Sequence, residues 1–96
     1  MERITMEELK EQETDRFLNH IRFMIKYWDS LPNKSSKEKM EGLAFSILVT
    51  LDGEASDLPA FIVAPVTYND RRKVRCNISG GLHDLFSTMK TQNDKI

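Results

Sequence analysis

The sequence predicts a small α+β domain whose elements follow the order α-α-β-β-α. Two long segments in the first half have apolar residues spaced three and four apart, and each begins at a capping box. Two short β-branched segments come next with turn residues between them, and a glycine pair then precedes a third amphipathic segment. A chain of 96 residues suits one hydrophobic core. We therefore expect a single domain over residues 1–96, with an ordered core from about residue 5 to about residue 90.

The first helix is expected to begin near Met6, because Thr5 and Glu8 form a capping box that satisfies backbone N–H groups at the helix start. It should end before Pro32, since a residue that precedes proline is disfavoured in the α region. Its apolar stripe consists of Phe17, Leu18, Ile21, Met24, Ile25 and Trp28. Phe23 and Tyr27 fall outside this stripe, and we expect them to pack in the core rather than to form an exposed aromatic patch.

The second long segment has a helical and a strand interpretation. Ser35 and Glu38 form another capping box, and Gly53 stands where a helix would end. As a strand, residues 43–51 would alternate between two faces. We prefer the helix, because the cap, the charged first turn and the length of the apolar stretch agree. Its small residues would let another backbone approach closely, and they are Gly42, Ser46 and Thr50.

An antiparallel hairpin is predicted next, with strands at residues 59–66 and 73–79 and turn residues at 67–70. Pro65 belongs on an edge or at a bulge of the first strand. In the second strand Val74, Cys76 and Ile78 should face the core, because they alternate with polar residues. A two-stranded hairpin alone is marginal in water and has two unpaired outer edges. We therefore expect two copies to form a homodimer through the hairpin edge, or a protein partner to add a strand there.

The last helix is expected to follow Gly80 and Gly81, with its inner stripe at Leu82, Leu85, Phe86 and Met89. The polar tail at residues 91–96 should be disordered.

Composition excludes several classes of protein. Lys and Arg number 14 against 15 Asp and Glu, so overall charge points to no partner. The single cysteine, Cys76, cannot form an internal disulfide and leaves a zinc site short of thiolates. There is no apolar run long enough to cross a membrane, and the N-terminal residues are acidic where a signal peptide would be basic. A cytoplasmic protein without membrane contact is expected.

No catalytic motif is present, so we expect no enzyme activity, no cofactor and no metal. Cys76 is interpreted as a small buried hydrophobic residue, and His20 and His83 as surface residues. His83 stands near a helix start, where backbone N–H groups can hold an anion. The helix entry alone accounts for the two glycines before it, so this is a weak phosphate signal.

Two charged clusters are the candidate binding sites. Asp52, Glu54 and Asp57 lie in an acidic loop that lacks the ligand spacing of a calcium loop, and they are a candidate recognition patch for a basic partner. The second cluster lies at the hairpin turn and consists of Arg71, Arg72, Lys73 and Arg75, with Tyr68 nearby. Basic side chains beside an aromatic ring can bind a phosphate backbone. They can also protect a strand edge from aggregation.

The runs EGLAFSILVTLDG, LPAFIVAP and ISGGLHDLF resemble a family of short uncharacterised proteins from bacteria and their prophages. The resemblance covers roughly residues 37–86. It implies a bacterial or phage setting and supplies no activity or site residue. The function expected from the residues is that of a small non-catalytic protein-interaction module, which acts by self-association or by binding a host or phage protein. The alternative is a nucleic-acid-binding accessory protein that uses the basic hairpin.

Overall fold

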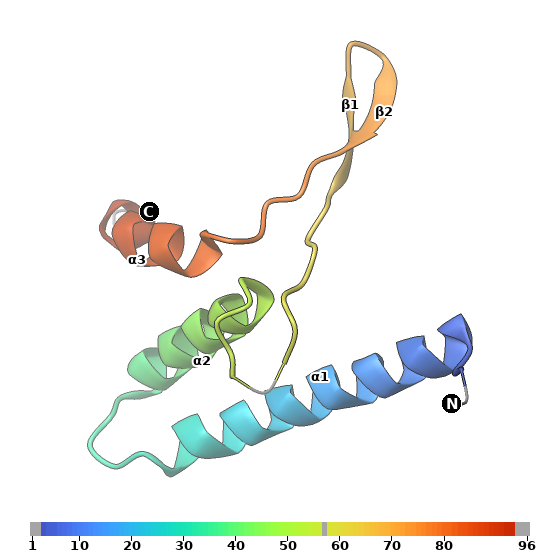
Figure 1. Cartoon of the computed structure of the whole chain (residues 1–96). Coiled ribbons are helices and arrows are strands. Elements are labelled where there is room, and N and C mark those ends of the chain that lie inside the picture. The colour runs from blue at the N-terminus through green and yellow to red at the C-terminus, as the bar shows by residue number, and fades with distance from the viewer. Residues whose placement is uncertain (1–2, 57, 94–96) are drawn as a thin grey trace. The chain divides into compact units, whose positions relative to one another are not determined.

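The computed structural model describes residues 3–56 and 58–93. Three helices and one two-stranded antiparallel sheet follow in the order α-α-β-β-α, which confirms the predicted fold class (Figure 1). The elements are α1 (Met6–Ser30), α2 (Ser36–Leu51), β1 (Val66–Asn69), β2 (Arg72–Arg75) and α3 (Leu82–Asn93). The chain divides into two compact units, Met1–Leu43 and Ala44–Ile96, and the division falls within α2. A single domain over residues 1–96 stays a prediction.

Both capping boxes predicted in the first unit are present. At the start of α1 the N–H of Glu8 donates to Thr5 Oγ1 at 3.1 Å, and the N–H of Thr5 donates to Glu8 Oε1 at 3.4 Å. Before α2 the N–H of Glu38 donates to Ser35 Oγ at 3.1 Å, and the N–H of Ser35 donates to Glu38 Oε1 at 2.9 Å. Local hydrogen bonding therefore sets the beginning of both helices.

Gly42 allows the ring of Trp28 to lie directly against α2. A Cβ atom added at Gly42 would stand 2.4 Å from two carbons of that ring, which is closer than any stable contact. The group that approaches Gly42 closely is thus an aromatic side chain, and not the backbone that was predicted. A second link joins the helices, because Lys39 Nζ donates to the carbonyl of Asp29 at 2.8 Å.

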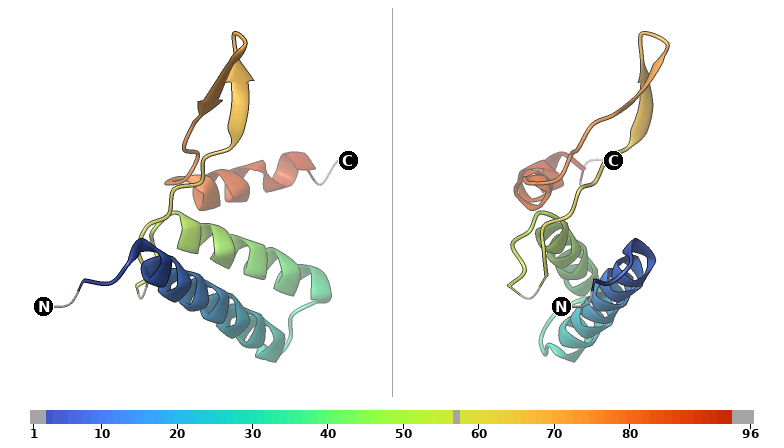
Figure 2. Two further views of the ribbon diagram at one scale, coloured as in Figure 1. Left: turned by 90° about the vertical axis from the view of Figure 1, so that its right-hand side faces the viewer. Right: turned by 45° about the vertical axis from the view of Figure 1, so that its right-hand side comes forward.

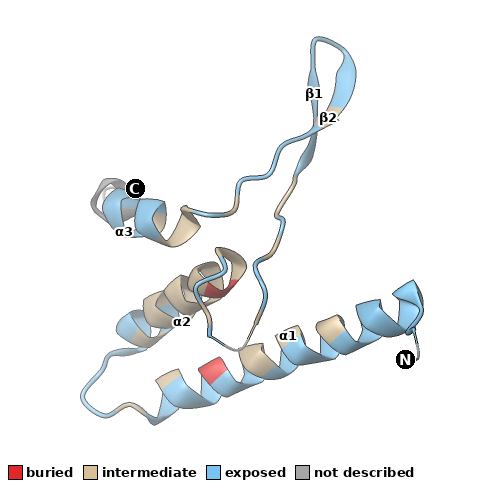
Figure 3. Cartoon of the chain, in the orientation of Figure 1, coloured by how far each residue is buried: buried red, intermediate tan, exposed pale blue. Residues whose placement is uncertain are grey.

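The prediction that Phe23 and Tyr27 pack in the core is wrong. Phe23 is 64% exposed and Tyr27 is 50% exposed, whereas Met24 on the apolar stripe is buried. The ring of Tyr27 meets that of Trp28 edge-on, at 5.6 Å between ring centroids. Figure 3 shows that most of α1 is exposed. The two rings lie off the stripe that carries Met24, so the packing that buries Met24 does not reach them.

The helical interpretation of residues 43–51 is confirmed, and α2 ends in a Schellman motif. Gly53 has a φ of +85°, which suits glycine. The N–H of Gly53 donates to the carbonyl of Thr50 and that of Glu54 to the carbonyl of Val49, both at 3.1 Å. This motif places Asp52 at the C-cap of α2, where its side chain is free to act elsewhere.

The hairpin forms, but its strands lie closer to the turn than predicted. The regular strands are β1 and β2, and Asp70 and Arg71 form a two-residue loop with φ of 51° and 65°. Two positive φ angles are typical of a type I′ turn, whose twist matches that of paired strands. The predicted strand at 59–66 is irregular because Pro59 and Pro65 have no N–H to donate to a ladder. Figure 2 shows the two strands running side by side to the turn.

Neither face of the hairpin is buried. Every residue of β1 and β2 is exposed except Val74, which is half-buried. Cys76 is also exposed and Ile78 is 47% exposed, so the prediction that these residues face the core is wrong. The alternation of the second strand was interpreted as a half-buried sheet, but no other described element of its unit covers the hairpin.

The last helix, α3, is more exposed and longer than predicted. Leu85 is 58% exposed and Met89 47%, although both were expected on an inner stripe. Residues 91–93 are helical, which contradicts the disorder expected from residue 91, and 94–96 lie outside the described residues. Among the described helices, none has the length and apolar content of a membrane span.

Candidate functional site

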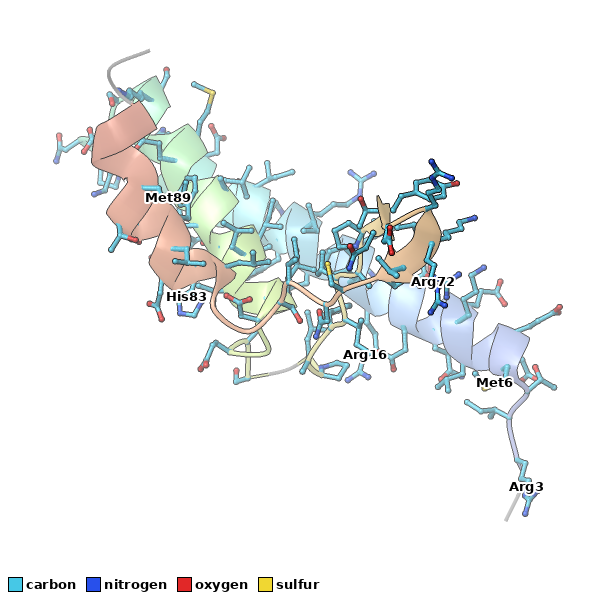
Figure 4. All side chains as sticks on the ribbon, turned by 90° about the horizontal axis from the view of Figure 1, so that it is seen from above. Arg3, Met6, Arg16, Arg72, His83 and Met89 are labelled. Carbon is cyan, nitrogen blue, oxygen red and sulfur yellow. The ribbon has the colours of Figure 1, made fainter. Side chains whose placement is uncertain are left out.

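The second unit contains a carboxylate–imidazole pair, formed by Asp52 after α2 and His83 in the first turn of α3. Asp52 Oδ2 lies 2.6 Å from His83 Nδ1 and accepts the backbone N–H of His83 at 2.8 Å. Asp52 Oδ1 accepts the N–H of Gly80 at 2.6 Å. Figure 4 shows His83 at the start of α3. One side chain therefore connects the end of α2 to the start of α3.

The surroundings of this pair favour its charged form. Burial raises the pKa of the Asp52 carboxyl, but hydrogen bonds from the backbone and ring of His83 and from the helix start outweigh burial and hold this pKa well below its usual range. The hydrogen bond to Asp52 raises the pKa of His83 against the effect of desolvation, and the carboxylates of Asp84 and Glu54 raise it further. Both shifts favour an ionised carboxylate beside a protonated imidazole.

The geometry fixes the role of each nitrogen in the His83 ring. A carboxylate can only accept, so Nδ1 carries a hydrogen and Nε2 is the atom that titrates. The Nε2 atom lies 3.5 Å from Oδ1 of Asp84, and the ring of Phe45 meets the imidazole edge-on at 5.7 Å. The His83 side chain is 17% exposed.

An Asp–His pair of this kind orients a base in many hydrolases, where a hydroxyl or thiol faces the second nitrogen. In the described part of this chain the group beside Nε2 is the exposed carboxylate of Asp84. The pair thus has the geometry of a structural ion pair at the start of α3. The Asp52 carboxylate lies where the helix dipole and the free N–H groups of the first turn favour negative charge.

The carboxylates of the predicted acidic loop do not share one exposed surface. The Asp52 side chain is 0% exposed, so its assignment to an exposed recognition patch is wrong. Glu54 is exposed as predicted, and Asp57 lies outside the described residues. Within residues 3–56 and 58–93, no group of three or more His, Cys, Asp and Glu side chains could hold a metal ion.

His83 was interpreted as a surface residue, and that prediction is wrong because Asp52 and Phe45 enclose it. The sequence marks the helix start beside Gly80 and Gly81 as a place where backbone N–H groups can hold an anion. The anion found there is the carboxylate of Asp52. The sequence signal available was an aspartate at the end of one helix and a glycine pair before the next, but nothing in the spacing of residues 52 and 83 links the two.

The second candidate site is the hairpin, which divides the basic cluster between two faces. Opposed residues of an antiparallel pair share a face, and Tyr68 stands opposite Lys73 while Val66 stands opposite Arg75. We call the surface formed by these four residues the tyrosine face. Tyr68 is 72% exposed and Val66 is 50% exposed.

The other basic residues lie elsewhere on the hairpin. Arg72 belongs to the opposite face with Val74, and Arg71 lies in the turn. Among the described residues, no carboxylate forms an ion pair with any of the four basic side chains. The cluster is therefore unpaired and gathered at the tip, but it does not form one continuous face.

Hydrogen bonds hold the base of the hairpin. Asn77 Oδ1 accepts the N–H groups of Val63 at 2.9 Å and Ser79 at 3.1 Å, and the hydroxyl of Ser79 donates to the carbonyl of Phe61 at 2.7 Å. The N–H of Ile78 donates to the carbonyl of Val63 at 2.7 Å. These bonds join the segments before β1 and after β2 although those segments are not regular strands.

Comparison of the chain with known protein families, with characterised proteins and with solved structures found no match. The resemblance to short bacterial and prophage proteins therefore stays a prediction.

Proposed function

We propose that this chain is a small non-catalytic interaction module that acts by adding its hairpin to the sheet of another protein chain. The observation that supports this most is the exposure of β1 and β2, because neither face is covered and each strand has a free outer edge. A two-stranded sheet gains little stability by itself, and an exposed edge is a template for pairing. The exposed Val66 and Tyr68 would be buried by such pairing.

A non-catalytic role fits the Asp52–His83 pair. The Asp52 carboxylate is fully enclosed and accepts backbone N–H groups at the start of α3, as a side chain that caps a helix does. A cytoplasmic location, in a bacterium or its phage, is part of the proposal. It fits the exposed free thiol of Cys76, since exposed thiols persist in a reducing compartment.

Nucleic-acid binding is the second candidate function. Tyr68 lies directly opposite Lys73, with Arg75 on the same face, so a base could stack on the ring while the cations meet phosphates. The position of Arg72 on the other face leaves few cations for one strand of nucleic acid. Fluorescence anisotropy with mixed-sequence DNA and RNA at low salt tests this candidate. No change in the anisotropy up to tens of micromolar protein would eliminate it.

Light scattering after size-exclusion chromatography tests the interaction module. We expect the mass to rise from one chain to two with concentration, and the double variant Val66→Ser/Tyr68→Ser to weaken association about tenfold or more, since it removes most of the apolar area of the tyrosine face. The matched control is Phe23→Ser/Tyr27→Ser, because these α1 side chains are similarly exposed. A single-chain mass at every concentration would eliminate the self-association half of the proposal, and dissociation by the α1 variant alone would contradict the assignment of the interaction to the hairpin.

A further inference from the structure

We propose that the partner of the hairpin is a second copy of this chain, and that the two copies pair through their β1 edges about a two-fold axis at Thr67. This inference rests on the proposed function and specifies the partner, the edge and the register.

The register of the hairpin determines which backbone groups point outward. In a hairpin with a two-residue loop, the residues that flank the loop form a hydrogen-bonded pair, and such pairs alternate along the ladder. Asn69 and Thr67 therefore point toward β2, while Val66 and Tyr68 direct their N–H and C=O groups outward. The bond from Ile78 to Val63 agrees, because Val63 is another odd-numbered residue that bonds toward the second strand in the same register.

Charge distinguishes the two outer edges. The strand β1 reads VTYN and carries no charge, whereas β2 reads RKVR and carries three cations. Lysine and arginine on an edge strand oppose pairing with another strand. Each whole chain has a formal net charge of −1, so two copies do not repel each other strongly. The uncharged β1 edge is therefore the one that a second copy can approach.

Among the symmetric pairings of two β1 edges, the one with Thr67 on the axis pairs both outward-pointing residues, Val66 and Tyr68, within the strand. Outward-pointing residues must face each other, and opposed residues must share a face of the sheet. With Thr67 on the axis, Val66 stands opposite Tyr68 of the partner subunit, and the reverse pair forms by symmetry. A β-branched residue opposite an aromatic one is a favourable cross-strand pair.

The equivalent pairing of two β2 edges is unfavourable. With Val74 on the axis, Lys73 would stand opposite Arg75 of the partner subunit, and like charges directly opposite destabilise a sheet. Pairing β1 with β2 of another copy is not symmetric and would continue into a filament rather than close. Pro65 does not interfere with the β1 edge, because it occupies an inward-pointing position, where its missing N–H would have faced the second strand.

The result would be a four-stranded antiparallel sheet in the order β2-β1-β1-β2. The two tyrosine faces join on one side of this sheet, with the four Val66 and Tyr68 side chains in the middle and Lys73 and Arg75 at the margins. Three or more strands with an apolar face are what an isolated hairpin lacks for stability.

Disulfide trapping tests the edge and the register. Opposed residues of a non-hydrogen-bonded pair have Cα atoms about 4.5 Å apart, which is within the range of a disulfide. In a Cys76→Ser background, Thr67→Cys should form a covalent dimer under mild oxidation, about tenfold faster than Val74→Cys. The two positions are matched controls, because Thr67 and Val74 stand opposite each other in the same hairpin. Faster trapping of Val74→Cys would overturn the assignment of the edge.

A charge at the axis gives an independent measurement. Thr67→Asp places two carboxylates opposite each other, and we expect the dissociation constant of the dimer to rise about tenfold or more. Val74→Asp should change the dissociation constant less, since residue 74 lies on β2 and does not face its own copy across the proposed axis. If the native chain is a monomer, the self-association under the proposed function fails as well. If the dimer forms but Thr67→Cys does not trap it and Thr67→Asp leaves it intact, only the β1 assignment is wrong.

Discussion

Replacing Asp52 with alanine should destabilise the second unit, because one carboxylate holds two parts of the fold together. Asp52 accepts the N–H groups of Gly80 and His83 and the ring N–H of His83. Removing a side chain that caps a helix start costs about 1 kcal/mol for each N–H that loses its acceptor. The two backbone N–H groups and the ring N–H of His83 lose theirs, so we expect a loss of about 3 kcal/mol in the free energy of unfolding.

Urea unfolding followed by circular dichroism at neutral pH measures this loss. Glu54→Ala is the control, because this neighbouring carboxylate is exposed and its removal should change stability by less than about 0.5 kcal/mol. Asp52→Asn keeps the shape of the side chain and removes its charge, and should fall between the two. Equal stabilities of Asp52→Ala and Glu54→Ala would refute the reasoning that the enclosed carboxylate caps α3.

The pH dependence of stability should depend on His83. Its folded pKa is raised, so its contribution is complete below the unfolded value of about 6.5 and is lost as pH rises through the folded value. Urea midpoints should therefore fall as pH rises above about 6.5, and they should fall less in His83→Gln but to the native extent in His20→Gln. The Gly42→Ala variant should be destabilised by about 1–2 kcal/mol despite its better helix propensity, because the new Cβ meets the ring of Trp28, and thermal melts would measure this. Arg71→Gly should stabilise the hairpin by about 1 kcal/mol, since glycine adopts a φ of +65° without strain, and a higher melting temperature would be the readout.

The helices were predictable because their signals are local. Both capping boxes, the end of α2 at Gly53 and the helical state of residues 43–51 depend on residues within one or two turns of each other. The positions of the two hairpin strands were predicted less accurately. The β-branched run at 59–66 resembles a strand, but Pro59 and Pro65 remove donors, and the uninterrupted ladder begins only at Val66.

Burial could not be predicted from alternation alone. Val74, Cys76 and Ile78 have the period of a half-buried strand, yet period only assigns residues to one face and does not supply a layer to cover it. The ion pair between Asp52 and His83 was missed for a different reason. It joins residues 31 positions apart, and neither residue differs locally from an ordinary loop or surface residue. In contrast, the clustering of basic residues at the hairpin turn was visible in the sequence, and only the pairing register shows how they divide between faces.

Amide hydrogen exchange, resolved by residue with NMR, tests the proposed assembly most directly. In one copy the N–H groups of Val66 and Tyr68 point outward, and in the β1-paired dimer they are hydrogen bonded. Their protection should rise with protein concentration, whereas the outward N–H groups of Lys73 and Arg75 should stay unprotected at every concentration. Concentration-dependent protection at Lys73 and Arg75, or fast exchange at Val66 and Tyr68 throughout, would contradict assembly through the β1 edge.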